Sequence, residues 1–338
     1  MTTTAHSTPD PGLIIDTLFM FQNTQAFKAA IELDLFTVVA SGATRVPEIA
    51  VRLKAAERGV RILCDFLTTR GFLVKSADSY AVSPAVAPFL DTRSPAYIGA
   101  MAKFLAHPTI TRSFEDLADK VRKGGASLGD STVDPENPIW VEFARHMSGF
   151  MGMVAGPLAA VVARPGESQK VLDISAGHGM FGIAVAKANV KAEIYGLDWK
   201  SVLTVARENA NKAGVGERFH EIPGSAFDVE FGRDYDLILI PNFLHHFDWN
   251  TCVRLLKRVR AAMKSTGIVA TSEFVPNPDR ITPLIPAAFS LQMLVGTPAG
   301  DAYTFAELNG MFREAGFPPS SSQQLGHSPQ TLILTPAS

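Results

Sequence analysis

The chain has 338 residues, of which 46% are hydrophobic, so it is long enough to bury a large core and to form two domains. Its formal net charge of -2 at pH 7 gives no electrostatic reason to expect a nucleic acid or an acidic membrane surface as a partner. The two cysteines, Cys64 and Cys252, lie far apart and indicate neither a metal cluster nor a disulfide framework.

The first twelve residues, MTTTAHSTPDPG, contain no basic segment followed by an apolar core. We interpret them as a disordered tail and not as a signal peptide. The longest apolar run, residues 150–163, contains Pro157 and is too short to span a bilayer. We therefore predict a soluble, cytoplasmic protein without a membrane partner.

The N-terminal third has helical spacing. Residues 13–36 place Phe27, Ile31 and Leu35 at near-helical intervals and predict one or two packed helices. Residues 46–90 predict a short helix, a turn, a second helix, Gly71 and two short strands. This order is the outline of a winged helix.

Two functions suit a winged helix. Arg58, Arg61 and Arg70 lie on or near its second helix and would suit DNA binding. The same helix holds Glu57 and Asp65, and contacts to a DNA backbone need clustered positive charge. We therefore favour a dimerising module without nucleic acid, with a cofactor-sensing DNA-binding regulator as the alternative.

The predicted secondary-structure pattern changes near residue 170. Residues 97–165 are mostly helical in pattern, apart from an exposed loop expected at residues 123–138. From there on, amphipathic helical stretches alternate with predicted strands at residues 170–175, 192–198, 218–223, 235–241 and 267–274. Such alternation predicts a parallel, doubly wound sheet.

A glycine-rich turn follows the first predicted strand, in VLDISAGHGMFG at residues 171–182. Gly177 and Gly179 lead into a helix that is expected to start near Met180. Glycine lets the backbone approach a ligand, and the helix N-terminus offers free N–H groups. The motif alone fits a nicotinamide dinucleotide, a flavin or S-adenosylmethionine.

Two acids narrow the choice of ligand. Asp198, at the end of the second strand, can accept hydrogen bonds from both hydroxyls of an unsubstituted ribose, which disfavours NADP. Asp173, inside the first strand, suits a cationic amino-acid ligand better than a pyrophosphate, directly or through water. The alternative role for Asp173 is to cap the turn.

The glycine-rich motif and the segments that follow it resemble those of a known family. LDISAGHG resembles the first motif of the S-adenosylmethionine-dependent methyltransferases, and the downstream order resembles the small-molecule O-methyltransferases typified by plant caffeate, flavonoid and acetylserotonin enzymes and their bacterial relatives. The resemblance spans nearly the whole chain. It implies a winged-helix dimerisation domain at residues 12–110, a helical connector at 111–165 that helps to roof the active site, and a mostly parallel, Rossmann-like methyltransferase sheet at 166–338. It also implies a homodimer.

The resemblance places S-adenosylmethionine on the glycine turn. Ser175 stands where the family usually has glycine, and Ser225 replaces the acid that usually binds the adenine amino group. Ordinary core packing is the alternative role for Phe227. The predicted cofactor-binding residues are Asp173, Ser175, Gly177, Gly179, Asp198, Trp199, Ser225, Ala226 and Phe227.

The segment PNFLHHFDWN resembles the Leu-His-Asp-Trp-Asp segment of the family. Keeping Leu244 and Asp248 in register assigns the catalytic base to His245 and puts His246 at the Asp position. Glu273 lies where the family keeps an acid that is hydrogen-bonded to this histidine. Histidine titrates near neutrality and can take a proton from a phenolic hydroxyl. The alternative is that the paired histidines cap the following helix.

The remaining family positions are less complete. The second flanking acid would fall on Ala302, and Asp301 lies one residue away, so the sequence leaves this acid open. Phe143 and Met147 match a Phe-x-x-x-Met pair that roofs cofactor and substrate in the family, with a core-facing helix stripe as the alternative. The apolar residues 284–298 indicate a flat, apolar ligand.

The sequence thus predicts transfer of a methyl group from S-adenosylmethionine to a hydroxyl of a small, aromatic molecule, with His245 as general base. A nitrogen- or carbon-methylating enzyme of the same fold stays open, as does an enzyme that works by alignment without a base. No histidine spacing indicates a metal, and we expect none.

Overall fold

The computed structural model describes residues 10–127, 129–326 and 328–338, in two compact units that divide between His107 and Pro108. Of the predicted tail at residues 1–12, residues 1–9 lie outside the described residues, and Gly12 already begins the first helix. The predicted division at 12–110, 111–165 and 166–338 stays a prediction. Within the described residues, no helix is both long enough and apolar enough to cross a membrane.

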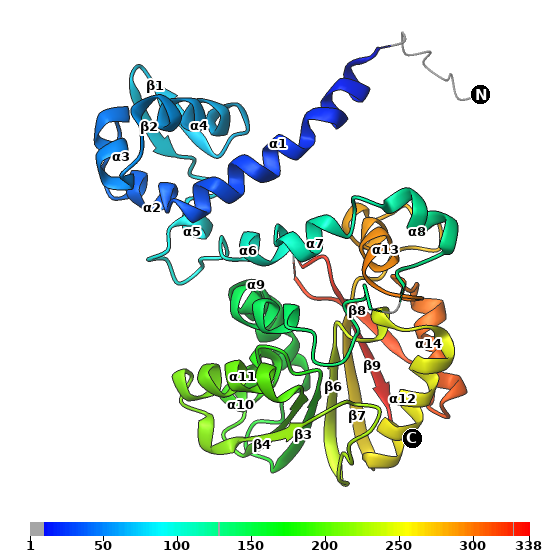
Figure 1. The fold of residues 1–338 in the computed structure, drawn as a ribbon. Helices are drawn as coiled ribbons and strands as arrows, with labels where there is room; N and C mark the ends of the chain where they lie inside the picture. The colour runs from blue at the N-terminus through cyan, green and yellow to red at the C-terminus, as the bar shows by residue number, and fades with distance from the viewer. Residues whose placement is uncertain (1–9, 128, 327) are drawn as a thin grey trace, which may run out of the picture. The chain divides into compact units, whose positions relative to one another are not determined.

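The first unit is helical with one small hairpin, and its elements follow the predicted order as far as the hairpin, after which a short helix that was not predicted follows (Figure 1). Gly71 has a φ of +78° between the second of two short helices and the hairpin, a conformation that glycine adopts without strain. The elements are α1 (Gly12–Glu32), α2 (Leu35–Ala40), α3 (Val46–Leu53), α4 (Glu57–Thr69), β1 (Leu73–Ser76), β2 (Ser79–Val82), α5 (Ala87–Leu90) and α6 (Met101–Leu105).

Helix α4 buries one face and exposes the other. Val60, Cys64 and Leu67 recur at helical spacing and pack into the core of this unit. On the exposed face, Arg61 Nη1 lies 3.1 Å from Asp65 Oδ2. One of the three arginines considered for DNA binding is therefore paired with an acid on its own helix.

The second unit begins with helices and continues with alternating strands and helices. Its helices are α7 (Pro108–Arg112), α8 (Leu117–Lys123), α9 (Ile139–Val162), α10 (Met180–Ala188), α11 (Lys200–Lys212), α12 (Trp249–Ala262), α13 (Leu284–Gly296) and α14 (Phe305–Glu314). Its strands are β3 (Gln169–Ile174), β4 (Ala192–Asp198), β5 (Phe219–Pro223), β6 (Tyr235–Pro241), β7 (Met263–Glu273), β8 (Ser321–Gln324) and β9 (Thr331–Pro336).

These strands form one sheet in the order β5-β4-β3-β6-β7-β9-β8 across the described residues. Strands β3 to β7 are parallel, as predicted, whereas β9 is antiparallel to β7 and β8. The β8–β9 hairpin was not predicted from the sequence. Strand β8 is the exposed, polar sequence SSQQ, which has no hydrophobic alternation to indicate a strand.

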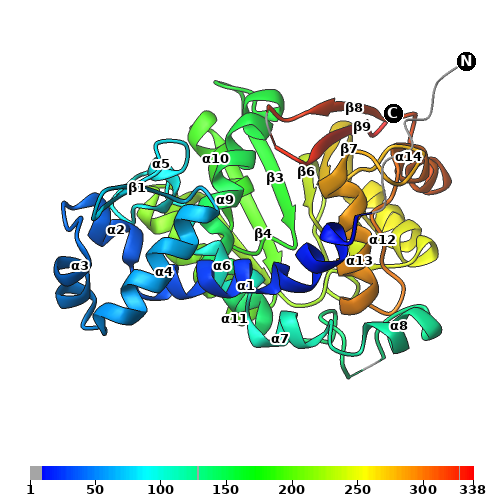
Figure 2. The ribbon, with the colours of Figure 1, turned by 90° about the horizontal axis from the view of Figure 1, so that it is seen from above.

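Helices cover both faces of the sheet (Figures 1 and 2). Helices α10 and α11 pack with α9 on one side, and α12 and α14 contact each other on the other side. On the α12 side the core joins residues such as Ile238 and Ile240 of β6 to Leu255 and Leu256 of α12. The chain order of the strands reverses between β3 and β6, so the ligand crevice of such a fold lies at their carboxyl ends.

Candidate active site

The glycine turn after β3 is strongly left-handed. Ser175, Gly177 and Gly179 have φ values of +56°, +57° and +74°. A Cβ on Gly179 would lie 3.1 Å from Ala206 Cβ, so the turn packs against α11 without room for a side chain. Ser175 adopts the conformation that glycine would take at this position, at a cost of roughly 1 to 2 kcal/mol.

Asp198 is bound to the same turn. Its Oδ2 accepts a hydrogen bond from Gly177 N at 2.8 Å, and its Oδ1 accepts one from Trp199 N at 2.7 Å. Burial raises the pKa of Asp198 to about 6, although both backbone bonds act in the opposite direction. A carboxylate offers about four lone-pair sites, so about two remain for a ligand.

Asp173 lies deeper, beneath α10. Its Oδ2 accepts a hydrogen bond from Gly182 N at 3.0 Å, whereas Oδ1 is buried without a partner among the described residues. Burial, opposed by the Gly182 bond and assisted by the charge of Asp198, raises the pKa of Asp173 to about 8. The bond to Gly182 matches the capping role, and the unpaired oxygen can still accept a hydrogen bond from a ligand.

Helix α9 contributes aromatic cover to the turn. The ring of Phe143 stacks on His178 with centroids 5.6 Å apart, and a Cβ on Gly177 would lie 3.4 Å from the Phe143 ring. Met147, one helical turn further, is buried. His178 is also buried rather than exposed, and burial lowers its pKa to about 3. Its Nδ1 accepts a hydrogen bond from Met180 N.

The predicted adenine-side residues lie after β4 and β5. Trp199 packs with residues of α9 and α11. Ser225 Oγ accepts a hydrogen bond from Phe227 N at 3.1 Å, which leaves its own hydroxyl hydrogen available. Ala226 belongs to the core, and the ring of Phe227 meets that of Phe247 edge-on at 5.0 Å. Core packing of Phe227 is thus observed, and its contact with a ligand stays a prediction.

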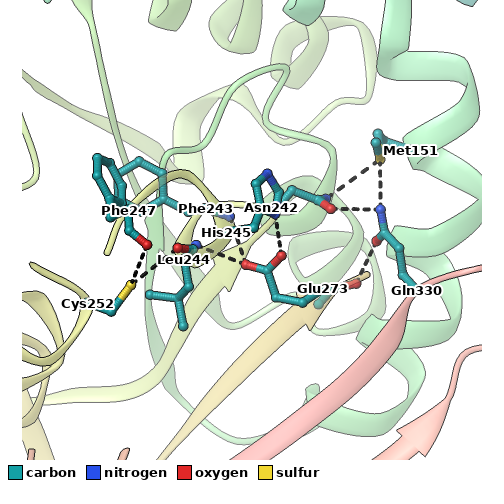
Figure 3. A network of polar contacts seen from close by, with 10 residues as sticks. Met151, Asn242, Phe243, Leu244, His245, Phe247, Cys252, Glu273 and Gln330 are labelled. Atoms are coloured by element: carbon teal, nitrogen blue, oxygen red, sulfur yellow. Dashed lines mark hydrogen bonds and ion pairs between the residues drawn. The ribbon is translucent and has the colours of Figure 1, made fainter. Parts of the chain in front are cut away.

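A buried histidine–carboxylate pair lies at the carboxyl ends of β6 and β7 (Figure 3). His245 stands in a 3-10 turn, Leu244–His246, and its Nδ1 is 2.5 Å from Oε2 of Glu273, the last residue of β7. Glu273 Oε1 accepts hydrogen bonds from Phe243 N at 3.0 Å and Leu244 N at 2.9 Å. Both carboxylate oxygens are therefore fixed, and the pair is less than 6% exposed.

Aromatic rings border this pair. Phe289 of α13 meets the ring of His245 edge-on at 4.8 Å, and Phe274 stacks on Phe289 at 4.2 Å. Phe289 belongs to the apolar segment 284–298 that the sequence analysis associated with the ligand. The structure therefore brings one side chain of that segment to His245.

His246 lies beside His245 in a different environment. The two ring centroids are 4.3 Å apart, and Trp140 contacts His246 edge-on at 5.2 Å. Its Nδ1 is buried without a hydrogen-bond partner among the described residues, and burial lowers its pKa well below the usual value. Asp248 caps α12 by accepting from Thr251 N, so the expected alternative of histidine caps is wrong.

The acid left open by the sequence does not reach this pair. Asp301 Oδ2 lies 2.9 Å from Arg280 Nη1, and about a third of the Asp301 side chain is exposed. Ala302 is fully buried. Among the described residues, Glu273 is the one carboxylate bonded to His245.

Four residues that sequence reasoning missed lie next to the pair in one polar network (Figure 3). They are Met151 of α9, Asn242 after β6, Ser272 of β7 and Gln330 before β9. The position of Asn242 directly after a strand end was a usable signal. Gln330 gave none, because the hairpin that brings it there was not predicted. The described residues contain no group of three or more His, Cys, Asp or Glu arranged to hold a metal ion.

Two family models match the chain: an O-methyltransferase domain over residues 114–318 and an O-methyltransferase dimerisation domain over residues 15–91. The crystal structure of a candidate O-methyltransferase from Nostoc punctiforme PCC 73102 is 48% identical, with a TM-score of 0.93 over 97% of this chain and 99% of the other. The 3-hydroxy-5-methyl-1-naphthoate 3-O-methyltransferase of Streptomyces sahachiroi is 28% identical over 90% of this chain and 89% of its own. Human N-acetylserotonin methyltransferase, solved in complex with S-adenosylmethionine, is 22% identical and shares the fold, with a TM-score of 0.83 over 99% of both chains.

Proposed function

The chain belongs to the O-methyltransferase family, and on this basis we propose that it transfers a methyl group from S-adenosylmethionine to a hydroxyl of a small aromatic molecule, with His245 as general base. The observation that supports the base most directly is the buried bond from His245 to Glu273, whose other oxygen is held by two backbone N–H groups.

The residues present fit the cofactor. When bound, S-adenosylmethionine supplies an electrophilic methyl group on a positively charged sulfur. Asp198 keeps about two acceptor sites for ribose hydroxyls beyond its two backbone bonds. The unpaired Oδ1 of Asp173 would be satisfied by a cationic amino group, directly or through water. Ser175, Gly177 and Gly179 would hold the ligand with their backbone, and Trp199, Ser225, Ala226 and Phe227 would surround the adenine.

The contact between His245 and Glu273 supports different roles for the two ring nitrogens of His245. A carboxylate can only accept a hydrogen bond, so the contact with Glu273 places a hydrogen on Nδ1 and leaves the lone pair on Nε2. That nitrogen would take the proton from the acceptor hydroxyl as the oxygen attacks the methyl carbon. Such general-base help contributes about 10²- to 10⁴-fold in rate, and alignment of the reacting atoms supplies much of the remainder.

The acceptor that fits this site is a flat aromatic molecule with a free hydroxyl. Phe289 and Phe274 present stacked aromatic surface beside His245, and aromatic rings pack favourably on such surfaces. The similarity to a hydroxynaphthoate O-methyltransferase supports a fused-ring phenol as the first acceptor to test. Phe143 and Met147 of α9 would close the site on the side of the glycine turn.

A homodimer completes the proposal. The dimerisation model covers residues 15–91, and the first half of α1 exposes apolar side chains, with Leu13 75% and Leu18 69% exposed. Apolar surface of this kind is typical of a protein interface. Light scattering of the full chain should give the mass of two copies, and a monomer at micromolar concentration would contradict this part.

The function is tested by ligand binding and product analysis. Calorimetry should show binding of S-adenosylmethionine and of its homocysteine product, and no binding of NAD. Incubation with methyl-labelled cofactor and a panel of naphthols should give a product that mass spectrometry and NMR identify as a methyl ether. A methyl group on carbon or nitrogen, with no ether formed, would refute the proposed acceptor atom.

A further inference from the structure

The turn that leads from β6 to the base has an unusual residue at its start. Asn242 has a φ of +53°, and its N–H donates to the carbonyl oxygen of Ser272 at 2.8 Å. The next two N–H groups, of Phe243 and Leu244, both reach Glu273 Oε1. The direction of these two donors, and the place of His245 after them, therefore depend on the left-handed conformation of Asn242.

The side-chain amide of Gln330 is hydrogen-bonded to the side chain of Asn242. Ser272 Oγ donates to Gln330 Oε1 at 2.7 Å, and Gln330 Nε2 donates to Asn242 Oδ1 at 2.8 Å. Both amide nitrogens also lie 3.9 Å from the sulfur of Met151. Figure 3 shows Gln330 between α9 and Asn242, on the side of Asn242 away from Phe247. This network of hydrogen bonds thus connects β7, the end of β6, the start of β9 and α9.

Most side chains of this network are buried, which restricts the orientations that they can adopt. Gln330 and Ser272 are fully buried, and Met151 is 3% exposed. A buried amide without hydrogen-bond partners is destabilising, so Gln330 is stable only in the orientation that satisfies Ser272 and Asn242 together. Glycine and asparagine both adopt the left-handed backbone of position 242, and asparagine adds a side-chain bond to Gln330.

We propose that Asn242 and Gln330 are positioning residues that set the general base His245 by fixing the turn that holds Glu273. Gln330 bonds both Ser272, which precedes Glu273 in β7, and Asn242, which lies three residues before His245. Neither Asn242 nor Gln330 is required to touch the acceptor. This inference builds on the role of His245 proposed above, and it adds a second set of residues on which the proton-transfer step depends.

The test is a double-mutant cycle in single-turnover methyl transfer, with S-adenosylmethionine and a naphthol acceptor. Asn242→Gly keeps the left-handed backbone and removes the amide, and Gln330→Leu removes both hydrogen bonds at similar volume. Each should lower the rate about 10-fold or more, because small misplacements of a catalytic group cost up to about 10²-fold. Cofactor affinity should change less than about threefold. Gln324→Leu is the matched control, since Gln324 is an exposed residue of β8 whose side-chain amide bonds Thr331 and no residue of the network around Asn242 among the described residues.

The cycle with His245→Ala separates positioning from a general structural effect. If Asn242 acts through His245, Asn242→Gly should have no further effect in the His245→Ala background. An equal loss in both backgrounds, or wild-type rates for Asn242→Gly, would overturn the inference. If Gln330→Leu fails to fold, Asn242→Gly alone decides. An unchanged rate in His245→Ala itself would instead refute the proposed base, which distinguishes the two failures.

Discussion

Glu273→Gln is the substitution that most directly tests the proposed base. The amide oxygen of glutamine can still accept from Phe243 N and Leu244 N, so the turn should keep its shape. The amide nitrogen would then face His245 Nδ1 and donate to it. The hydrogen of the neutral imidazole would move to Nε2, and the lone pair that should receive the acceptor proton would be lost.

The magnitude follows from this exchange of partners. To act as a base, His245 must return its hydrogen to Nδ1, where it would face an N–H group of the glutamine. This loses a hydrogen bond to a charged group, worth about 1.5 to 3 kcal/mol, and leaves a buried donor unsatisfied at about 1 to 3 kcal/mol. The sum of roughly 2.5 to 6 kcal/mol corresponds to about 10²- to 10⁴-fold in rate.

The assay is single-turnover transfer of labelled methyl to an acceptor whose hydroxyl has a pKa well above the working pH, because an ionised phenol needs no base. Cofactor titration and thermal unfolding of the same variant should stay close to the wild type. Glu193→Gln is the control, since Glu193 Oε2 contacts His220 Nε2 at 2.7 Å in an exposed carboxylate–histidine pair. Transfer by Glu273→Gln at the wild-type rate would show that this pair does not set the rate of proton removal.

Three further outcomes are expected. His245→Ala should lose about 10²- to 10⁴-fold in rate and His246→Ala much less, as measured by single turnover; the opposite order would move the base to His246. Asp198→Ala should weaken binding of S-adenosylmethionine by roughly 1 to 3 kcal/mol in calorimetry, and unaltered affinity would place the ribose elsewhere. The pKa of Asp173 is raised to about 8 in the folded chain, so its stabilising contribution is present at low pH and is lost as the pH rises toward 8. Asp173→Asn should therefore gain roughly 1 to 4 kcal/mol in unfolding free energy relative to the wild type between pH 5 and pH 8, and a pH-independent difference in denaturant titrations would contradict this.

The parallel strands and the site residues at their carboxyl ends could be predicted, because short stretches of sequence determine them. Strands β3, β4 and β6 are mostly apolar and buried, and Asp198, His245 and Glu273 each lie at or just after a strand end. Such positions meet at one edge of a parallel sheet, so their convergence follows from strand order alone.

The missed features depend on segments that are distant in sequence. Asn242 and Gln330 are 88 residues apart and meet because an antiparallel hairpin returns to β7. His178 lies in the glycine turn, and its burial depends on Phe143 of α9, which covers it. Asp301 could be placed only once Arg280 was seen beside it. Tertiary contacts decided all three, and neither propensity nor spacing records them.

The antiparallel strand β9 has a consequence for synthesis of the protein. It pairs with β7 from Ile268 to Glu273, yet the ribosome makes it after every other strand of the sheet. Until β9 emerges, β7 is an open edge with buried-type residues such as Val269 and Ala270 and unpaired backbone groups. Open edges of this kind recruit other strands and promote aggregation. We therefore expect the nascent chain to depend most on a chaperone after β7 is made and before β9 pairs with it. The turn that holds His245 is completed only when β9 has paired.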